Sequence, residues 1–214
     1  MKLIVGNKNY SSWSLRPWLV MKVAGIDFDE ERIALYGPQS RQQILAFSPA
    51  GKVPCLMDGA LAVWDSLAIC EFLAEKNPSL WPQDPAARAV ARSVSAEMHS
   101  GFQNLRTHMS MNIRKFHPGK GRTPEVLAEI ERVVAMWSDC RARYGQGGPF
   151  LFGRFSIADA MYAPVVLRFR TYEVGLPEAC RAYSNAILAL PAMKEWIAAA
   201  TAETELLPQF EQYG

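Results

Sequence analysis

The sequence is poor in the residues that build disulfide frameworks and metal centres. It contains only four cysteines, which lie far apart and form no C-x-x-C pair, and only three histidines. Such spacing is typical of reduced, buried thiols in a cytoplasmic protein and argues against a disulfide framework or a zinc site. The histidines are too few and too poorly grouped for a metal centre, so we expect no metal.

Long apolar runs and charge of one sign are missing as well. The apolar stretch near the N-terminus covers only residues 3–5, which is too short for the core of a signal peptide. No run approaches the roughly 18 apolar residues of a membrane span. The formal net charge is only +2, and the basic residues are scattered rather than gathered into a nucleic-acid surface. We therefore expect a cytoplasmic globular protein that binds neither membrane nor nucleic acid.

Short strand and helix patterns alternate over the first part of the chain. Asp58-Gly59 lies between two apolar runs, which is a strong signal for a β-hairpin. Ser14 stands where a cap of the first helix is expected, and Pro17 lies near the start of that helix, where a missing N–H costs nothing. The predicted elements are strands at 2–6 and 28–35, hairpin strands at 53–57 and 61–64, and helices at 14–24, 40–47 and 66–76. Their order along the chain is βαβαββα.

A proline-rich segment at residues 77–85 marks the best domain boundary. Three prolines in this short stretch forbid a continuous helix. We therefore expect one domain over residues 1–81 and a second over residues 87–214. Strand patterns vanish in the second domain, and apolar residues recurring every three or four positions predict amphipathic helices. These predicted helices are one long helix over 90–113, a second over 126–137, and others at 156–172, 178–189 and 192–202.

Three local sequence patterns stand in matching structural contexts. Residues 10–17, Tyr-Ser-Ser-Trp-Ser-Leu-Arg-Pro, follow the first strand; residues 51–54, Gly-Lys-Val-Pro, precede the hairpin; residues 64–69, Trp-Asp-Ser-Leu-Ala-Ile, open the third helix. Together they resemble the glutathione transferase superfamily, and in particular its serine-type, zeta-like bacterial members. The resemblance implies the glutathione transferase fold: a thioredoxin-like α/β domain that holds glutathione, followed by an all-α helical bundle domain.

The resemblance also implies which residues bind glutathione. Asp65 and Ser66 start a helix, so its N–H groups and the Ser66 hydroxyl would receive the γ-glutamyl carboxylate while Asp65 pairs with the ammonium. A cis Val53–Pro54 bond would free the Val53 backbone to pair with the cysteinyl residue. Lys52 would meet the glycyl carboxylate. Taken without the resemblance, Asp65-Ser66 is an ordinary helix cap and Lys52 is a solvated lysine.

The loop before the first helix would carry the catalytic hydroxyl. A free thiol titrates at about 8.5, so a hydroxyl that donates to the sulfur favours the reactive thiolate. Ser11 lies where serine-type members carry their catalytic serine, and Ser12 is close enough to share the task. Without the resemblance, both serines are caps and loop solvators. The loop contains no thiol, which excludes disulfide exchange by this loop.

The chain departs from the zeta pattern at one position. Trp13 stands where zeta members carry a cysteine, which is expected to reshape the pocket mouth and weakens the case for maleylacetoacetate isomerase activity. The second-substrate pocket is expected between the first loop and the long helix. Periodicity alone makes Phe102 and Met109 core residues and Arg106 a surface residue. The residues expected to line this pocket are Trp13, Met98, Phe102, Arg106 and Met109.

The function that the resemblance implies is that of a glutathione transferase working in detoxification. The glutathione thiolate would attack a small, electrophilic and largely apolar co-substrate, and the protein would be a homodimer. Two alternatives stay open: a glutathione-dependent isomerase or peroxidase, and a non-catalytic, transferase-like interaction protein. The joint presence of Ser11, Val53-Pro54 and Asp65-Ser66 argues against the non-catalytic alternative.

Overall fold

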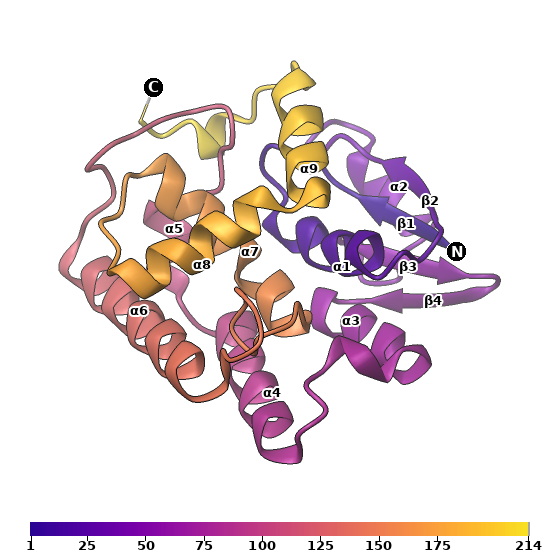
Figure 1. The fold of residues 1–214 in the computed structure, drawn as a ribbon. Helices are drawn as coiled ribbons and strands as arrows, with labels where there is room; N and C mark the ends of the chain where they lie inside the picture. The colour runs from indigo at the N-terminus through magenta and orange to yellow at the C-terminus, as the bar shows by residue number, and fades with distance from the viewer. Residues whose placement is uncertain (214) are drawn as a thin grey trace.

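The computed structural model describes residues 1–213. The N-terminal part of the chain forms a four-stranded mixed sheet (Figure 1). The strands are β1 (Lys2–Val5), β2 (Asp29–Arg32), β3 (Cys55–Asp58) and β4 (Leu61–Trp64). Their spatial order is β2-β1-β3-β4, with β2 parallel to β1 and the other two neighbouring pairs antiparallel. β2 is shorter than the strand predicted over residues 28–35, and it is an edge strand made of four charged residues.

Helices cover both faces of this sheet. They are α1 (Ser12–Val23), α2 (Ser40–Leu45) and α3 (Ser66–Lys76), followed by a short 3₁₀ helix, Pro78–Leu80. Successive strand residues point to opposite faces. Leu3 and Val5 therefore pack into the core with α1 and α3, whereas Ile4 packs with Ile44 of α2. The predicted βαβαββα order and the thioredoxin-like architecture are confirmed.

The rest of the described chain is helical. Its helices are α4 (Pro85–Ser100), α5 (Gln103–His108), α6 (Pro124–Tyr144), α7 (Ile157–Thr171), α8 (Glu178–Ala189), α9 (Pro191–Ala202) and a 3₁₀ helix, Pro208–Phe210. The single long helix predicted over residues 90–113 is wrong. Gly101 is extended and Phe102 takes a left-handed φ of 59°, which breaks the helix between α4 and α5. The apolar periodicity continues across the break because both pieces bury side chains in one core.

α7 is the central helix of the molecule. All of its residues except Arg170 are buried, and it packs against both α1 and α4. Its N-terminus has a capping box in which the buried Asp159 carboxylate accepts hydrogen bonds from the N–H groups of Ser156 (2.8 Å) and Leu151 (3.0 Å). One continuous core therefore joins the α/β part to the helical part, and the domain division at residues 81 to 87 stays a prediction.

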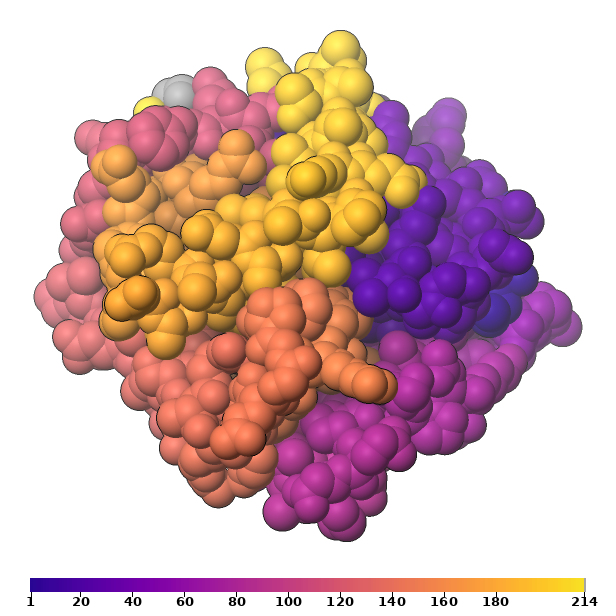
Figure 2. Space-filling view, in the orientation of Figure 1, coloured from indigo at the N-terminus to yellow at the C-terminus, as the bar shows by residue number. Residues whose placement is uncertain are grey.

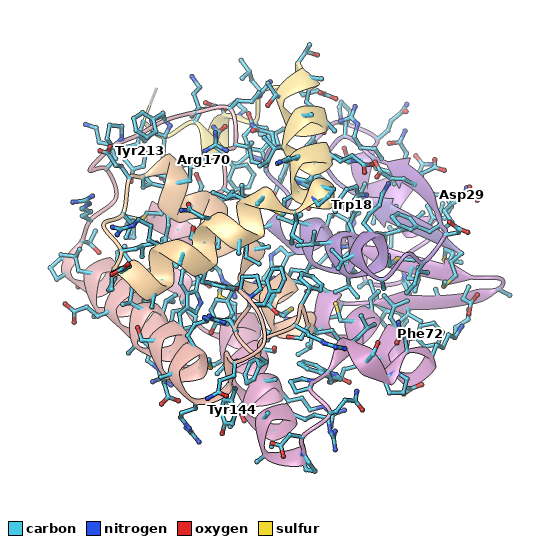
Figure 3. All side chains as sticks on the ribbon, in the orientation of Figure 1. Trp18, Asp29, Phe72, Tyr144, Arg170 and Tyr213 are labelled. Atoms are coloured by element: carbon cyan, nitrogen blue, oxygen red, sulfur yellow. The ribbon has the colours of Figure 1, made fainter. Side chains whose placement is uncertain are left out.

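The C-terminal helices also rest on the α/β part. Trp18 of α1, labelled in Figure 3, packs edge-on against Trp196 of α9 with the ring centroids 5.0 Å apart. Figure 2 shows the yellow C-terminal segments lying against the indigo N-terminal residues. Within residues 1–213, no helix is both long and apolar enough to cross a membrane.

Candidate functional site

The loop after β1 ends in a hydroxyl that caps α1. Ser11 is the N-cap, and its Oγ accepts a hydrogen bond from the Ser14 N–H at 3.4 Å. The cap predicted at Ser14 is therefore wrong. Ser14 lies inside the first turn because the helix begins at Ser12, two residues earlier than its apolar pattern suggests. Both Ser11 and Ser12 line the larger of two cavities at this end of the sheet.

Two buried serines form a chain of hydroxyl groups that leads to this cavity. The Gly6 N–H donates to Ser14 Oγ at 3.1 Å, and Ser14 Oγ lies 2.7 Å from Ser11 Oγ. Because hydroxyl protons rotate to suit their partners, Ser14 can donate to Ser11 when Ser11 donates onward. Among the described residues the half-buried Ser12 hydroxyl has no hydrogen-bond partner. A sulfur atom here would also face the N-terminus of α1, whose dipole favours an anion.

A smaller cavity of about 460 Å³ lies beside the turn that precedes β3. Val53–Pro54 is the cis peptide bond expected there. The residues lining the cavity come from the loop after β1, this turn, the end of β4 and the start of α3. They are Trp13, Ala50, Lys52, Val53, Pro54, Trp64, Asp65 and Ser66. Six of the site residues expected from the sequence thus line this smaller cavity.

The N-terminus of α3 opens onto the smaller cavity. Asp65 is the N-cap, with a φ of 75°, and its Oδ1 accepts the N–H groups of Leu67 (2.9 Å) and Ala68 (3.3 Å). Ser66 is buried, and its Oγ has no partner within the described chain. An unsatisfied buried hydroxyl at a helix N-terminus is suited to receive a carboxylate. The roles that the resemblance implies for Asp65 and Ser66 require such an opening, and those roles stay a prediction.

His99 is a residue of this site that the sequence analysis missed. It comes from α4, and its Nε2 lies 3.2 Å from the second oxygen of Asp65. Its ring meets the Trp13 indole edge-on at 5.2 Å. Burial lowers the pKa of His99, and the nearby Asp65 carboxylate only partly opposes this effect. No local signal marks His99, since its partner is far away in the sequence.

Two arginines lie close to the Trp13 ring. The guanidinium carbons of Arg16 and Arg106 lie 4.4 and 4.5 Å from the indole centroid. Arg16 is buried, which lowers its pKa to about 9. Its Nε and Nη1 have no hydrogen-bond partner in the described structure. Arg106 also donates to the carbonyl groups of Met98 and His99 at the end of α4. Neither arginine forms an ion pair with a described carboxylate.

The larger cavity has a volume of about 600 Å³ and is lined with cations. Arg41, Lys52, Arg106 and Arg168 contribute to its wall, and no acidic residue does. Arg168 of α7 is buried and donates to the Met109 carbonyl. Its burial and the nearby Arg106 lower its pKa to about 10. An anion entering this cavity would meet positive charges that form no ion pair with a described carboxylate, although Glu129 acts on Arg106 from a distance.

The structure places the predicted second-substrate residues in two groups. Trp13 and Arg106 line the larger cavity, as expected. Met98, Phe102 and Met109 are buried in the core and are not among its lining residues. The break at Gly101 separates α4 from α5, so one helix face does not run along the pocket. The lining residues that the sequence analysis missed include Tyr10, Arg168 and Phe210.

Metal ligands are not grouped in the described part of the chain. Residues 1–213 contain no group of three or more His, Cys, Asp or Glu side chains that could hold a metal ion. The four cysteines are free and buried. The polar side chains that line the two cavities carry hydroxyl, guanidinium, ammonium and carboxylate groups.

Comparison with known proteins gives a consistent result. The model of the glutathione S-transferase N-terminal domain matches residues 10–76, and that of the C-terminal domain matches residues 120–199. A probable maleylacetoacetate isomerase of Caenorhabditis elegans is 34% identical over 161 residues, which cover 71% of this chain and 73% of that protein. The maleylacetoacetate isomerase of Rattus norvegicus is 29% identical over 194 residues, covering 86% and 85%.

A solved structure agrees in fold. The holo structure of a maleyl pyruvate isomerase, described as a bacterial zeta-class glutathione S-transferase, matches with a TM-score of 0.70 and 20% identity. The match covers 96% of this chain and all of that one. With both domain models matched and a relative aligned over most of its length, the chain belongs to the glutathione S-transferase family.

Proposed function

We propose that this protein is a glutathione-dependent isomerase of a small, anionic, conjugated substrate. The observation that carries the proposal is the larger cavity, in which four cationic side chains and no acidic ones meet the Ser11 hydroxyl. A carboxylate substrate gains charge-assisted hydrogen bonds from arginine. The relatives named maleylacetoacetate isomerase support this choice over conjugation of a largely apolar electrophile.

The smaller cavity would hold glutathione. The Ser66 hydroxyl and the N-terminus of α3 receive its γ-glutamyl carboxylate, and Asp65 receives its ammonium. The Val53 backbone pairs with its cysteinyl residue, and Lys52 meets its glycyl carboxylate. The two cavities share Trp13, Lys52 and Val53, so a thiol held at Val53 would lie where they meet.

Different residues of the chain then act on the sulfur and on the substrate. Bound glutathione supplies a thiolate whose reversible addition to the conjugated carbon turns a double bond into a single bond that can rotate. Ser11 donates a hydrogen bond to the sulfur, with Ser14 and the Gly6 N–H behind it. Arg106 and Arg168 hold the substrate carboxylate and stabilise the negative charge that develops on its carbonyl oxygen. No net proton is consumed, because the sulfur adds as a thiolate and leaves as a thiolate.

A direct assay tests the isomerase proposal. The protein is incubated with glutathione and a cis-configured unsaturated keto dicarboxylic acid, and the trans product is followed by proton NMR. We expect turnover that requires glutathione, and an Arg106→Met variant whose KM rises by roughly 10- to 100-fold. Arg92→Met is the matched control, because Arg92 is an exposed arginine paired with Glu71. Absence of glutathione-dependent product in the unmodified protein would refute the proposal.

Conjugation is a second candidate that one observation favours. Leu35, Met111 and Phe210 give the larger cavity an apolar side, which suits a flat electrophile. Incubation with glutathione and 1-chloro-2,4-dinitrobenzene, followed by absorbance, measures this activity. A conjugation rate that exceeds the isomerisation rate at saturating substrate would make transfer the main function.

We also propose that the protein acts as a cytoplasmic homodimer. The four free, buried cysteines fit a reducing compartment. Trp64 is 47% exposed at the end of β4, beside the smaller cavity, and a twofold contact is the commonest arrangement of soluble oligomers. Light scattering at micromolar concentration tests the assembly, and a monomeric mass would contradict it.

A further inference from the structure

The C-terminal segment, residues 203–213, returns from α9 to the larger cavity. The Glu203 carboxylate accepts hydrogen bonds from the N–H groups of Lys8 (2.7 Å) and Asn9 (3.0 Å), just before the Ser11 loop. Arg114 donates to the carbonyl groups of Glu203 and Glu205. The segment is thereby fixed to the α/β part at one point and to the loop after α5 at another.

Phe210 is the residue of this segment that reaches the cavity wall. Its ring stacks on Tyr10 with centroids 5.5 Å apart and an interplanar angle of 24°. Its other neighbour is Tyr36, which meets it edge-on at 6.0 Å from the loop between β2 and α2. Tyr36 is 69% exposed. The two rings therefore join the C-terminal segment to the α/β part across the outer end of the cavity.

Glu211 holds Phe210 in this place. Its Oε1 accepts a hydrogen bond of 2.5 Å from the Tyr10 hydroxyl and one of 2.9 Å from the Asn112 side chain. Its other carboxylate oxygen lies 3.7 Å from Lys115. Ser110 and Asn112 donate to the Phe210 carbonyl as well, at 3.4 and 3.5 Å. Phe210 is thus anchored through its own backbone and through the residue that follows it.

We propose that Phe210 is a specificity-determining residue that forms, with Tyr36, the apolar outer end of the second-substrate cavity. The proposal rests on the proposed function, since it takes this cavity as the co-substrate site. Arg106 and Arg168 line the cavity elsewhere, so the matching substrate is amphipathic. Such a substrate carries a carboxylate for the arginines and a flat or aliphatic apolar part for Phe210. Glu211 acts on the substrate indirectly, by positioning Phe210 and its stacking partner Tyr10.

Binding of two glutathione thioethers tests this role without any turnover. S-methylglutathione fills the smaller cavity, whereas S-hexylglutathione extends its alkyl chain from the sulfur into the larger one. Calorimetry gives the ratio of their dissociation constants. We expect the Phe210→Ala variant to reduce the preference for the hexyl compound by about fivefold to twentyfold, because the chain loses apolar contact. Its affinity for S-methylglutathione should change by less than about twofold. Phe116→Ala is the control, since Phe116 is 63% exposed and does not line the cavity.

The Glu211 variants test the anchoring. Glu211→Ala should reproduce the loss seen with Phe210→Ala, whereas Glu211→Gln keeps an acceptor for Tyr10 and should retain most of the preference. Phe210→Leu, which keeps an apolar side chain, should fall between alanine and the unmodified protein. An unchanged or larger preference for the hexyl compound in Phe210→Ala would overturn the proposal. The proposal also fails if the unmodified protein binds S-methylglutathione but shows no preference for S-hexylglutathione. If the unmodified protein binds S-methylglutathione weakly or not at all, the glutathione site itself fails, which is a distinct result.

Discussion

Replacing Ser11 by alanine tests the hydroxyl chain that leads from Gly6 through Ser14 to the cavity. In the proposed complex Ser11 donates a hydrogen bond to the glutathione sulfur and so stabilises the thiolate. A hydrogen bond to a charged group contributes about 1.5–3 kcal/mol. One pKa unit corresponds to about 1.4 kcal/mol. The variant should therefore raise the pKa of the bound thiol by roughly 1–2 units.

The two neighbouring serines give graded comparisons. Ser14→Ala leaves Ser11 in place but removes the group behind it, so the pKa of the bound thiol should rise by only about a few tenths of a unit. Ser12→Ala should also have a smaller effect than Ser11→Ala, since Ser12 is outside the chain of hydroxyls. Ser11→Thr keeps the hydroxyl, so the pKa of the bound thiol should stay close to its value in the unmodified protein.

Ultraviolet absorbance of the thiolate against pH, with glutathione at saturation, measures these pKa values. Because Ser11 is also the N-cap of α1, Ser11→Ala should lower the free energy of unfolding by about 1 kcal/mol, and thermal melting monitors this effect. Glutathione affinity, measured by calorimetry below the thiol pKa, should change little. A thiol pKa that rises in Ser12→Ala but not in Ser11→Ala would refute the assignment of the donor.

Three further predictions concern binding and stability. Ser66→Ala should weaken glutathione binding by about 1–3 kcal/mol in calorimetry, because the γ-glutamyl carboxylate loses a donor; an equal loss in the exposed Ser79→Ala control would contradict this. Asp159→Ala should lower the free energy of unfolding in denaturant by about 2–5 kcal/mol, since two N–H groups lose their acceptor, whereas exposed Asp139→Ala should cost less than about 1 kcal/mol. Burial lowers the pKa of His99 below its usual 6.5. Just below pH 6.5 the unfolded chain therefore binds more protons than the folded protein, so the free energy of unfolding falls as the pH is lowered through this range. Melting against pH should show a smaller fall in His99→Gln, and parallel curves would contradict the reasoning.

Local patterns were enough to predict the order of the strands and helices in the α/β part. The alternation of apolar residues and the Asp58-Gly59 turn depend on neighbours in sequence, which is why they survive in the folded protein. The α4–α5 break was missed because Phe102 keeps the apolar spacing while its backbone turns left-handed. Periodicity reports which residues are buried, and Phe102 is buried on both descriptions, so it carries no signal for the change in its backbone angles.

Contacts between distant segments were beyond the reach of the sequence. Tyr10 and Glu211 are 201 positions apart, and no spacing or motif joins them. The same holds for Arg168, which reaches the cavity only because α7 packs against α1. The smaller cavity was predicted far better, since the resemblance supplied three motifs and the fold brings them together. The larger cavity depends on tertiary packing, and there the sequence named core residues such as Met98 and Met109.

The exchange of the zeta-type cysteine for Trp13 looked unfavourable to isomerase chemistry in the sequence, whereas the proposed function gives Trp13 a supporting role. A buried arginine normally needs a carboxylate partner, and such a partner would cancel the charge that an anionic substrate requires. The indole face stabilises a nearby guanidinium group by about 0.5–2 kcal/mol without adding negative charge. Arg106 is held in this way and by two helix-terminal carbonyls. Arg106 forms no ion pair with a described carboxylate, although Glu129 acts on it from a distance. Under the proposed function, Trp13 therefore helps to hold a cation that an anionic substrate can reach.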